Sequence, residues 1–321
     1  MITAYVHANG MLTPVALQRG DAIPEAAVWI DVLSPEDEDL VFVDQALGLD
    51  VPTEEDMQEI EMSSRLYQED DALYMTATMI CNADTPEPQN VPVTFVLARQ
   101  RLLTLRYAEP TPFRMYAAQV QRHAMPCASG EEVLAGLLDA IVDRIADILE
   151  RVQGDAEKLS GEIFRKDSKA KHDYNGTLVR IGACHGLVTR ARDSLVSFGR
   201  MVSFVARPTE AKRSKSTERS FKTVARDVTS LSDHATFLAN NISFMLDATL
   251  GLINNEQTGI IKIFSVAAVV FLPPTLIASI YGMNFEYMPE LAWTYGYPMS
   301  IGLMVLFAIL PYLFFKFRGW L

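Results

Sequence analysis

The sequence predicts an α+β membrane protein, with an N-terminal α/β domain, long stalk helices and two C-terminal transmembrane helices. Three observations predict this fold class. Short β-type and helical segments alternate over residues 1–127, and apolar residues recur at three- and four-residue spacing over residues 128–258. Two apolar stretches of helix length then fall within residues 259–321.

The N-terminal part contains five segments that are rich in β-branched and aromatic residues or alternate apolar with polar residues, as strands do. They are Ile2–His7, Ala27–Val32, Ala72–Cys81, Val91–Ala98 and Arg101–Tyr107. Ser34 followed by Pro35 predicts a helix start, with serine as the cap and proline in the first turn. Pro52–Ser63 and Pro112–His123 also predict helices.

The middle part predicts three long helices. The first two carry apolar stripes over Val133–Ile163 and Leu178–Val205, and Glu210–Ser220 predicts the turn that follows. The third has a heptad pattern made by Phe221, Val224, Val228, Leu231, Ala235, Leu238, Ile242, Met245 and Thr249. No proline interrupts residues 221–272, so one helix of about 78 Å would connect the stalk with the first span.

Two spans are predicted at about residues 260–281 and 298–316. Lys262 is the only charge from 260 to 281, and none occurs from 298 to 315, which matches the ~20 apolar residues that cross a bilayer. A buried core helix is the alternative for either stretch. Lys262, Lys316 and Arg318 flank the spans, while the loop 284–297 carries only acidic charges. This asymmetry places both termini in the cytoplasm and the loop in the periplasm.

The net charge of −12 is concentrated near the N-terminus, where Met1–Asp71 holds seventeen acidic and two basic residues. Such a surface repels nucleic acid and concentrates cations, although an ordinary solvated acidic surface has the same composition. The sequence has no glycine-rich phosphate loop and no nucleophile–base pair, and its five histidines form no tight metal motif. The sequence therefore predicts that the chain is not an enzyme.

One helical stripe through the first span is mostly small or polar. Steps of three and four residues connect Asp247, Gly251, Asn254, Thr258, Ile261, Ser265, Ala268, Leu272, Thr275 and Ser279. Tight helix packing and a water-lined pore are both typical reasons for such a stripe. The presence of the polar residues Asp247 and Asn254 on the same stripe favours a pore. Ile261 and Leu272 would then form apolar rings about 16 Å apart, able to block ions by dewetting. Pro273-Pro274 predicts a bend beyond the second ring.

Asn284 follows the first span and carries a neutral amide. Its carbonyl can accept a hydrogen bond from water bound to a cation, and Mg²⁺ gives up its waters reluctantly. A ring of amides would therefore bind a hydrated divalent ion without holding it as strongly as carboxylates would. Gly282 would permit the tight turn that such a ring needs, although a Gly-X-Asn turn is also an ordinary helix cap.

The stretch Tyr281–Leu291, preceded by Phe271–Thr275 and followed by the basic, aromatic end Lys316–Leu321, resembles the CorA magnesium transporter family. The resemblance covers the membrane region almost residue by residue. It extends more loosely through Trp29-Ile30-Asp31, Glu59-Ile60-Glu61 and Thr104-Leu105-Arg106. Gly-Met-Asn in this setting is highly specific to that family.

The resemblance implies a funnel-shaped homopentamer in the bacterial inner membrane that admits Mg²⁺, and also Co²⁺ and Ni²⁺. It implies that Gly282, Met283 and Asn284 form the selectivity filter. It further implies that cytoplasmic Mg²⁺ binds between subunits and closes the channel, with Glu59 and Asp227 as ligands. Relatives have a Glu-Asp-Ile run where this chain has Gln58-Glu59-Ile60, so Glu59 would replace the aspartate. The acids within residues 31–44 or 69–71 are the other places for such a sensor.

Two other functions fit parts of the sequence. A related two-span zinc transporter would share the architecture, but Met283 in the middle of the filter favours magnesium. A membrane-anchored signalling domain would need a catalytic or ligand-binding motif in the N-terminal part, and the sequence offers none.

Overall fold

The computed structural model describes residues 1–8, 10–69, 71–164, 173–207, 214–284, 286 and 288–319. These residues form two compact units, Met1–Met245 and Leu246–Leu321, and the boundary falls within one long helix. The Asp70 carboxylate, considered above as a sensor candidate, and the motif residues Phe285 and Tyr287 lie outside the described residues.

A mixed seven-stranded sheet organises the N-terminal unit, in the order β2-β1-β3-β7-β6-β5-β4. Among the described strands only β3 and β7 pair in parallel. The strands are β1 (Ile2–Ala8), β2 (Met11–Leu17), β3 (Ala27–Leu33), β4 (Leu66–Glu69), β5 (Ala72–Cys81), β6 (Gln89–Ala98) and β7 (Arg101–Arg106). The five predicted strands are confirmed, whereas β2 and β4 were not predicted.

The two missed strands are the edges of the sheet. In β2 only Leu12 is buried, and Pro14 sits in the strand, which an edge tolerates because one side of it forms no ladder. The four residues of β4 are half-buried or exposed. A strand that buries little has no apolar alternation for sequence reasoning to detect.

Two predicted helix boundaries near the N-terminus are wrong. Helix α1 (Asp37–Leu47) begins three residues after Ser34, which adopts a positive φ of 45°, and Glu36 forms a reciprocal capping box with Asp39. The helix predicted over Pro52–Ser63 is two short ones, α2 (Glu54–Gln58) and α3 (Met62–Arg65).

The break between α2 and α3 occurs at Glu59. Thr53 caps α2 by accepting a hydrogen bond from the Asp56 backbone N–H, and Glu59 then leaves helical geometry with ψ of 143°. The following Ile60 is 91% exposed, so no apolar contact continues the helix. Helical propensity alone, without packing of an apolar face, does not keep this acidic stretch in one helix.

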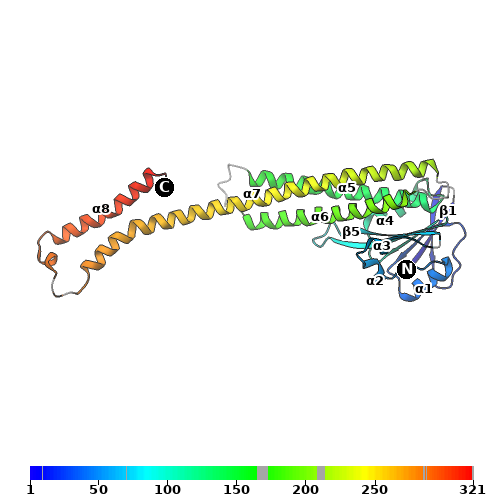
Figure 1. Ribbon diagram of the computed structural model, residues 1–321, viewed down its shortest axis with the longest axis horizontal. Helices are drawn as coiled ribbons and strands as arrows, with labels where there is room; N and C mark the ends of the chain where they lie inside the picture. Colours follow the sequence, from blue (N-terminus) through cyan, green and yellow to red (C-terminus); the bar gives the residue numbers. More distant parts are fainter. Residues whose placement is uncertain are drawn as a thin grey trace. The chain divides into compact units, whose positions relative to one another are not determined.

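Each face of the sheet buries a separate apolar cluster. Helices α4 (Thr111–Arg122), α5 (Gly130–Ile163) and α6 (Tyr174–Val205) cover one face, and α1 and α2 cover the other (Figure 1). Trp29, Phe95 and Phe113 lie at the centre of the larger cluster, with Tyr5 stacked on Trp29 at a centroid distance of 4.1 Å. The helix predicted over Pro112–His123 is confirmed as α4.

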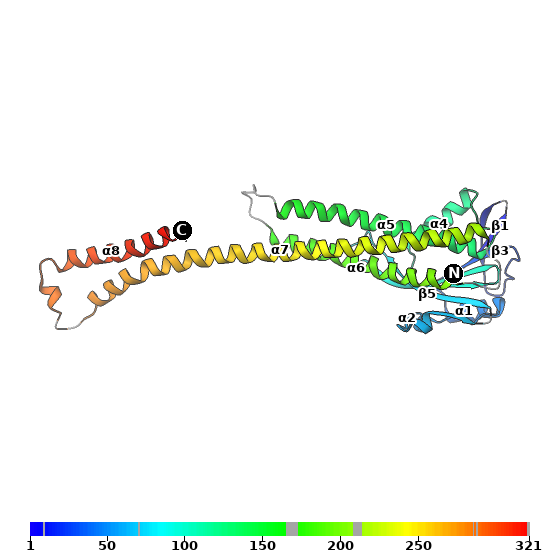
Figure 2. The same cartoon turned by 45° about the horizontal axis from the view of Figure 1, so that its top comes forward.

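Helix α7 (Lys215–Tyr281) contains the predicted third stalk helix and the first span (Figure 2). The heptad pattern is confirmed, because its residues are buried except for the partly buried Leu231. The turn predicted over Glu210–Ser220 is wrong in its second half, since Lys215–Ser220 is already helical. The helix also continues through Pro273 and Pro274 to Tyr281.

The C-terminal unit consists of the end of α7, a short 3₁₀ helix η1 (Pro289–Ala292) and helix α8 (Gly296–Phe317). Both α7 and α8 contain a segment long and apolar enough to cross a membrane, with mean hydropathies of 2.2 and 2.0. Helix α8 returns antiparallel beside the end of α7 (Figures 1 and 2).

Candidate functional site

The ten positions of the predicted pore stripe are all exposed on α7. The neighbouring face differs, because Val266 is buried and Val270, Pro273 and Ile277 are half-buried. Helix α8 runs antiparallel beside this end of α7 within the C-terminal unit (Figure 1). The polar stripe therefore lies on an exposed side of α7 within the C-terminal unit.

Two hydroxyl groups on this stripe are oriented by the helix itself. Thr258 Oγ1 donates a hydrogen bond to the Asn254 carbonyl oxygen at 2.7 Å, and Thr275 Oγ1 donates to that of Phe271 at 2.8 Å. Because each hydroxyl hydrogen is used in this way, the oxygen lone pairs remain for an outside donor. The stripe therefore offers hydrogen-bond acceptors along the span.

The predicted filter directly follows the end of α7. The Gly282 N–H donates to the Ala278 carbonyl at 2.9 Å, and the Met283 N–H donates to that of Ile280 at 3.3 Å. Gly282 is not among the described residues with positive φ, so the backbone angle does not by itself require glycine here. A Cβ at this position would lie 3.0 Å from the Ala278 oxygen, so close approach to the helix end explains the glycine.

Asn284 follows the helix with an exposed side chain, and residues 293–296 hold the last part of the described loop at the start of α8. The rings of Trp293 and Tyr295 meet edge to face at 6.0 Å, and the Gly296 N–H donates to the Trp293 carbonyl at 2.9 Å. A Cβ on Gly296 would collide with the Glu290 carbonyl, so glycine lets η1 pack against the start of α8.

The two predicted regulatory ligands lie on different elements of the N-terminal unit. Glu59 follows α2 with an exposed side chain, and Asp227 is half-buried on α7. No hydrogen bond or ion pair joins them among the described residues. In the same residues no group of three or more His, Cys, Asp or Glu side chains could hold a metal ion.

Sequence reasoning missed the acidic neighbours of Asp227. Burial raises the pKa of Asp139 on α5, and the carboxylates of Asp143 and Asp227 add to that shift. The spacing of Asp139 and Asp143 places them on one face of α5. That face is detectable from sequence, but its position opposite Asp227 depends on how α5 and α7 pack.

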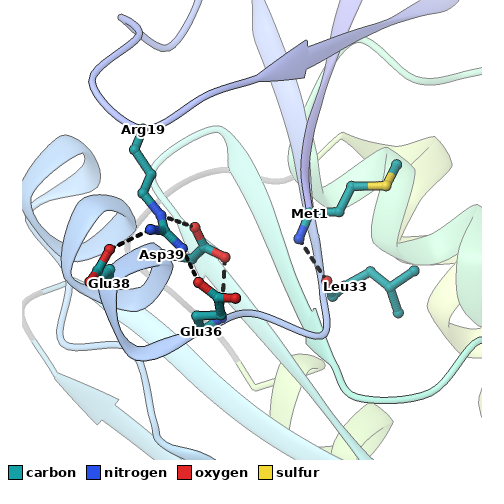
Figure 3. Close-up of polar contacts among 6 residues, drawn as sticks. All are labelled: Met1, Arg19, Leu33, Glu36, Glu38 and Asp39. Carbon is teal, nitrogen blue, oxygen red and sulfur yellow. Dashed lines mark hydrogen bonds and ion pairs between the residues drawn. The ribbon is translucent and has the colours of Figure 1, made fainter.

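Part of the acidic surface is neutralised by one arginine. Figure 3 shows the Arg19 guanidinium between Glu36, Glu38 and Asp39 at the start of α1, with 2.7 Å from Nε to Asp39 Oδ1. The hydrogen bond from Arg19 lowers the pKa of Asp39. These acids already have a cationic partner, which weakens them as candidates for a Mg²⁺ sensor.

Asp31 has a buried partner of its own. The guanidinium of Arg106 donates to both carboxylate oxygens, at 3.0 and 2.7 Å, and Thr104 Oγ1 donates to Oδ1 at 2.7 Å. Asp31 and Thr104 are paired residues of the parallel strands β3 and β7. Two of the tripeptides that resemble the family, Trp29-Ile30-Asp31 and Thr104-Leu105-Arg106, therefore lie side by side in the sheet. Asp31 is thus a structural residue rather than an available cation ligand.

These features define a class of protein, namely a membrane protein with two C-terminal spans behind a mixed α/β unit. Residues 24–316 match the family model described as CorA-like Mg²⁺ transporter protein. The chain is also 34% identical over 321 residues to "Magnesium transport protein CorA" of Escherichia coli (strain K12), which covers 100% of both proteins. The chain therefore belongs to the CorA-like Mg²⁺ transporter family, whose members are transporters and not enzymes.

Solved structures confirm the predicted fold class. The CorA magnesium transporter from Methanocaldococcus jannaschii matches with a TM-score of 0.73 at 18% identity, over 100% of this chain and 99% of that one. The ZntB cytoplasmic domain from Vibrio parahaemolyticus matches with a TM-score of 0.58 at 11% identity, over 79% of this chain and 98% of that one. Identities this low show the fold alone, so the fold does not select a transported ion.

Proposed function

We propose that the chain assembles as a homopentamer in the bacterial inner membrane and forms a channel for Mg²⁺ influx, with Co²⁺ and Ni²⁺ as further cations. Family membership supports Mg²⁺ as the transported ion. The basic residues that flank both spans support cytoplasmic termini, with the loop 284–297 in the periplasm. In this channel residues 1–127 would form the cytoplasmic α/β domain, residues 128–258 the stalk and residues 259–321 the membrane part.

The observation that carries the proposal is the exposed polar stripe on α7. Ser265, Thr275 and Ser279 place exposed hydroxyl groups within the span, where polar groups are costly against lipid. Asp247 and Asn254 continue the same exposed stripe on the cytoplasmic side. Copies of the chain arranged around an axis would place this stripe on a central aqueous path. Ile261 and Leu272, each 64% exposed, would then form two apolar constrictions that close by dewetting.

The chemistry of the stripe and filter suits a hydrated cation. Water bound to Mg²⁺ directs its hydrogens outward, so a path for the intact hydrate must offer acceptors. The hydroxyl oxygens of Thr258 and Thr275, together with Ser265 and Ser279, supply them along the span. Asn284, beside Gly282 and Met283, would supply a ring of amide oxygens at the periplasmic mouth.

Regulation by cytoplasmic Mg²⁺ would use Glu59 of one subunit and Asp227 of its neighbour. The exposed Glu59 and the half-buried Asp227 lie on separate elements, which supports a site shared between subunits. Like charges repel without a cation between them, so Mg²⁺ would brace the subunits in the closed state. Helix α7 would transmit its release to Ile261 and Leu272.

We expect uptake by purified protein in liposomes to follow the membrane potential without ATP. A divalent cation gains about 4.6 kcal/mol per 100 mV of inside-negative potential, twice the value for one charge. The measurement is Mg²⁺ influx at imposed potentials of both signs, with Zn²⁺ influx compared under the same conditions. Uptake that needs ATP or ignores the potential would contradict a channel, and Zn²⁺ uptake with no Mg²⁺ uptake would favour the zinc transporter.

Replacement of both Glu59 and Asp227 by alanine should weaken inhibition by internal Mg²⁺ while maximal influx is retained. A change in the ratio of closed to open channels from 1:99 to 99:1 requires about 5.5 kcal/mol, shared among the Mg²⁺ sites. Even a partial loss of ligands should therefore leave channels open when cytoplasmic Mg²⁺ is high. The matched control is Glu55→Ala with Asp233→Ala, which changes the net charge equally, in α2 just before Glu59 and on α7. Unchanged inhibition in the first double variant would place the sensor elsewhere.

A further inference from the structure

A hollow of about 480 Å³ opens in the N-terminal unit beside the parallel strand pair. It lies between the carboxyl ends of β3 and β7 on one side and α4 on the other, lined by Asp31, Arg106 and Arg114 among others. Ligands of α/β sheets bind outside the carboxyl ends of parallel strands, where the connections leave room. Its volume is typical of a pocket for a small molecule.

The floor of the hollow is rigid and still has donors to offer. Arg106 is 6% exposed and is held by Asp31, by the Ala108 carbonyl at 3.0 Å and by the ring of Phe113, 4.8 Å from its guanidinium carbon. Contacts among the described residues engage three of its five N–H donors. Two donors therefore remain on a side chain that packing holds in place.

Helix α4 lines the hollow with small side chains in the middle and a basic side chain at each end. Ala117 and Ala118 face the hollow between Arg114 and the pair Gln121 and Arg122, at helical spacings of three, four, seven and eight residues. Neither Arg114 nor Arg122 makes an ion pair within the described residues. Two such arginines converge on one hollow in a chain whose net charge is −12.

The opposite wall adds hydroxyl groups, and one acid lies at the rim. Thr3 and Tyr5 line the hollow from β1. Burial raises the pKa of Tyr5 to about 12, an effect that the Asp31 carboxylate strengthens and the Arg106 guanidinium opposes. The Tyr5 hydroxyl therefore stays protonated and can donate a hydrogen bond. Glu109 also lines the hollow and is an acceptor for ligand hydroxyls.

From this arrangement we infer that the hollow binds a small phosphomonoester with a hydroxylated body. Arginine forks match phosphate oxygens in bidentate geometry, so Arg114 and Arg122 receive the phosphate, with Arg106 beneath it. Glu109 accepts from the sugar-like hydroxyls, which a free phosphate lacks. The hollow is separate from the proposed ion path, because all of its residues belong to the N-terminal unit.

The test is binding of ribose 5-phosphate and inorganic phosphate to the full-length protein in detergent, measured by equilibrium dialysis. Trp29 fluorescence in a Trp293→Phe, Trp320→Phe background reports occupancy, because Trp29 stacks on Tyr5. We expect ribose 5-phosphate to bind more tightly than phosphate. Removal of either arginine, by Arg114→Gln or Arg122→Gln, should weaken the binding of ribose 5-phosphate roughly tenfold. Glu109→Ala should remove the preference for ribose 5-phosphate over phosphate.

The matched control is Arg192→Gln with Arg226→Gln, which removes two exposed arginines from other helices and should leave binding unchanged. Thermal unfolding of every variant checks that the fold is retained. The inference is overturned if ribose 5-phosphate does not bind, if it binds no better than phosphate, or if correctly folded arginine variants bind it as the parent does.

Discussion

Asn284→Ala should reduce Mg²⁺ influx in liposomes to the level of liposomes without protein. The side chain is exposed just beyond the end of α7 and packs into no described core, so its removal takes away an acceptor without a folding cost. Five copies of the amide would bind the hydrated ion at the mouth, and alanine has no group to replace them. The measurement is influx at fixed inside-negative potential, with oligomer size checked by light scattering.

Two further variants sharpen this experiment. Asn240→Ala removes the same amide from an exposed position on α7 in the N-terminal unit and should transport normally. Asn284→Asp keeps an acceptor but adds charge, so we expect tighter Mg²⁺ binding and slower influx. Normal influx through a correctly assembled Asn284→Ala protein would remove Asn284 from the ion path.

Asp31→Ala should have the largest effect on stability. The carboxylate and the Arg106 guanidinium are 8% and 7% exposed, and loss of one partner leaves the other charge buried and uncompensated. Such a loss typically costs about 3–5 kcal/mol of unfolding free energy. The measurement is urea unfolding of the full-length chain in detergent, in the Trp293→Phe, Trp320→Phe background, followed by the fluorescence of Trp29, whose Nε1 donates to Thr104 in the same network.

A surface pair provides the comparison. Glu38→Ala breaks an ion pair between the half-exposed Arg19 and a carboxylate that is 78% exposed, and exposed pairs contribute about 0–1 kcal/mol. Replacement of both buried partners, by Asp31→Leu with Arg106→Met, should cost less than Asp31→Ala alone because no unpaired charge remains. Equal stability of the Asp31→Ala variant and the parent would mean that water or another group compensates Arg106.

The stalk and the spans could be predicted from the sequence because their signals are local. In a helix, the three- and four-residue spacing determines which side chains share a face, and the heptad residues from Phe221 to Thr249 are buried as that spacing requires, with Leu231 partly so. The length and apolarity of residues 260–281 are likewise properties of a continuous segment. The motif at Tyr281–Leu291 also identified the family before any tertiary contact was known.

The N-terminal unit was harder to predict because its signals are shared between distant segments. Strand β2 is an edge that buries little, and the helix start near Ser34 depends on a reciprocal cap between Glu36 and Asp39. The interruption at Glu59 separates two short helices within one acidic, helix-favouring stretch. Neither propensity nor periodicity encodes these boundaries.

The sequence by itself determined the two spans, the stalk heptads, the family and the candidate filter, since each is written in residues close together in the chain. Only the tertiary structure decided that Asp31 pairs with Arg106, 75 residues away, and that Asp227 faces Asp139 on α5. It also decided that the polar stripe of α7 stays exposed within the C-terminal unit. The physical reason is that burial and charge pairing depend on which distant surfaces meet, whereas helical periodicity and span length do not.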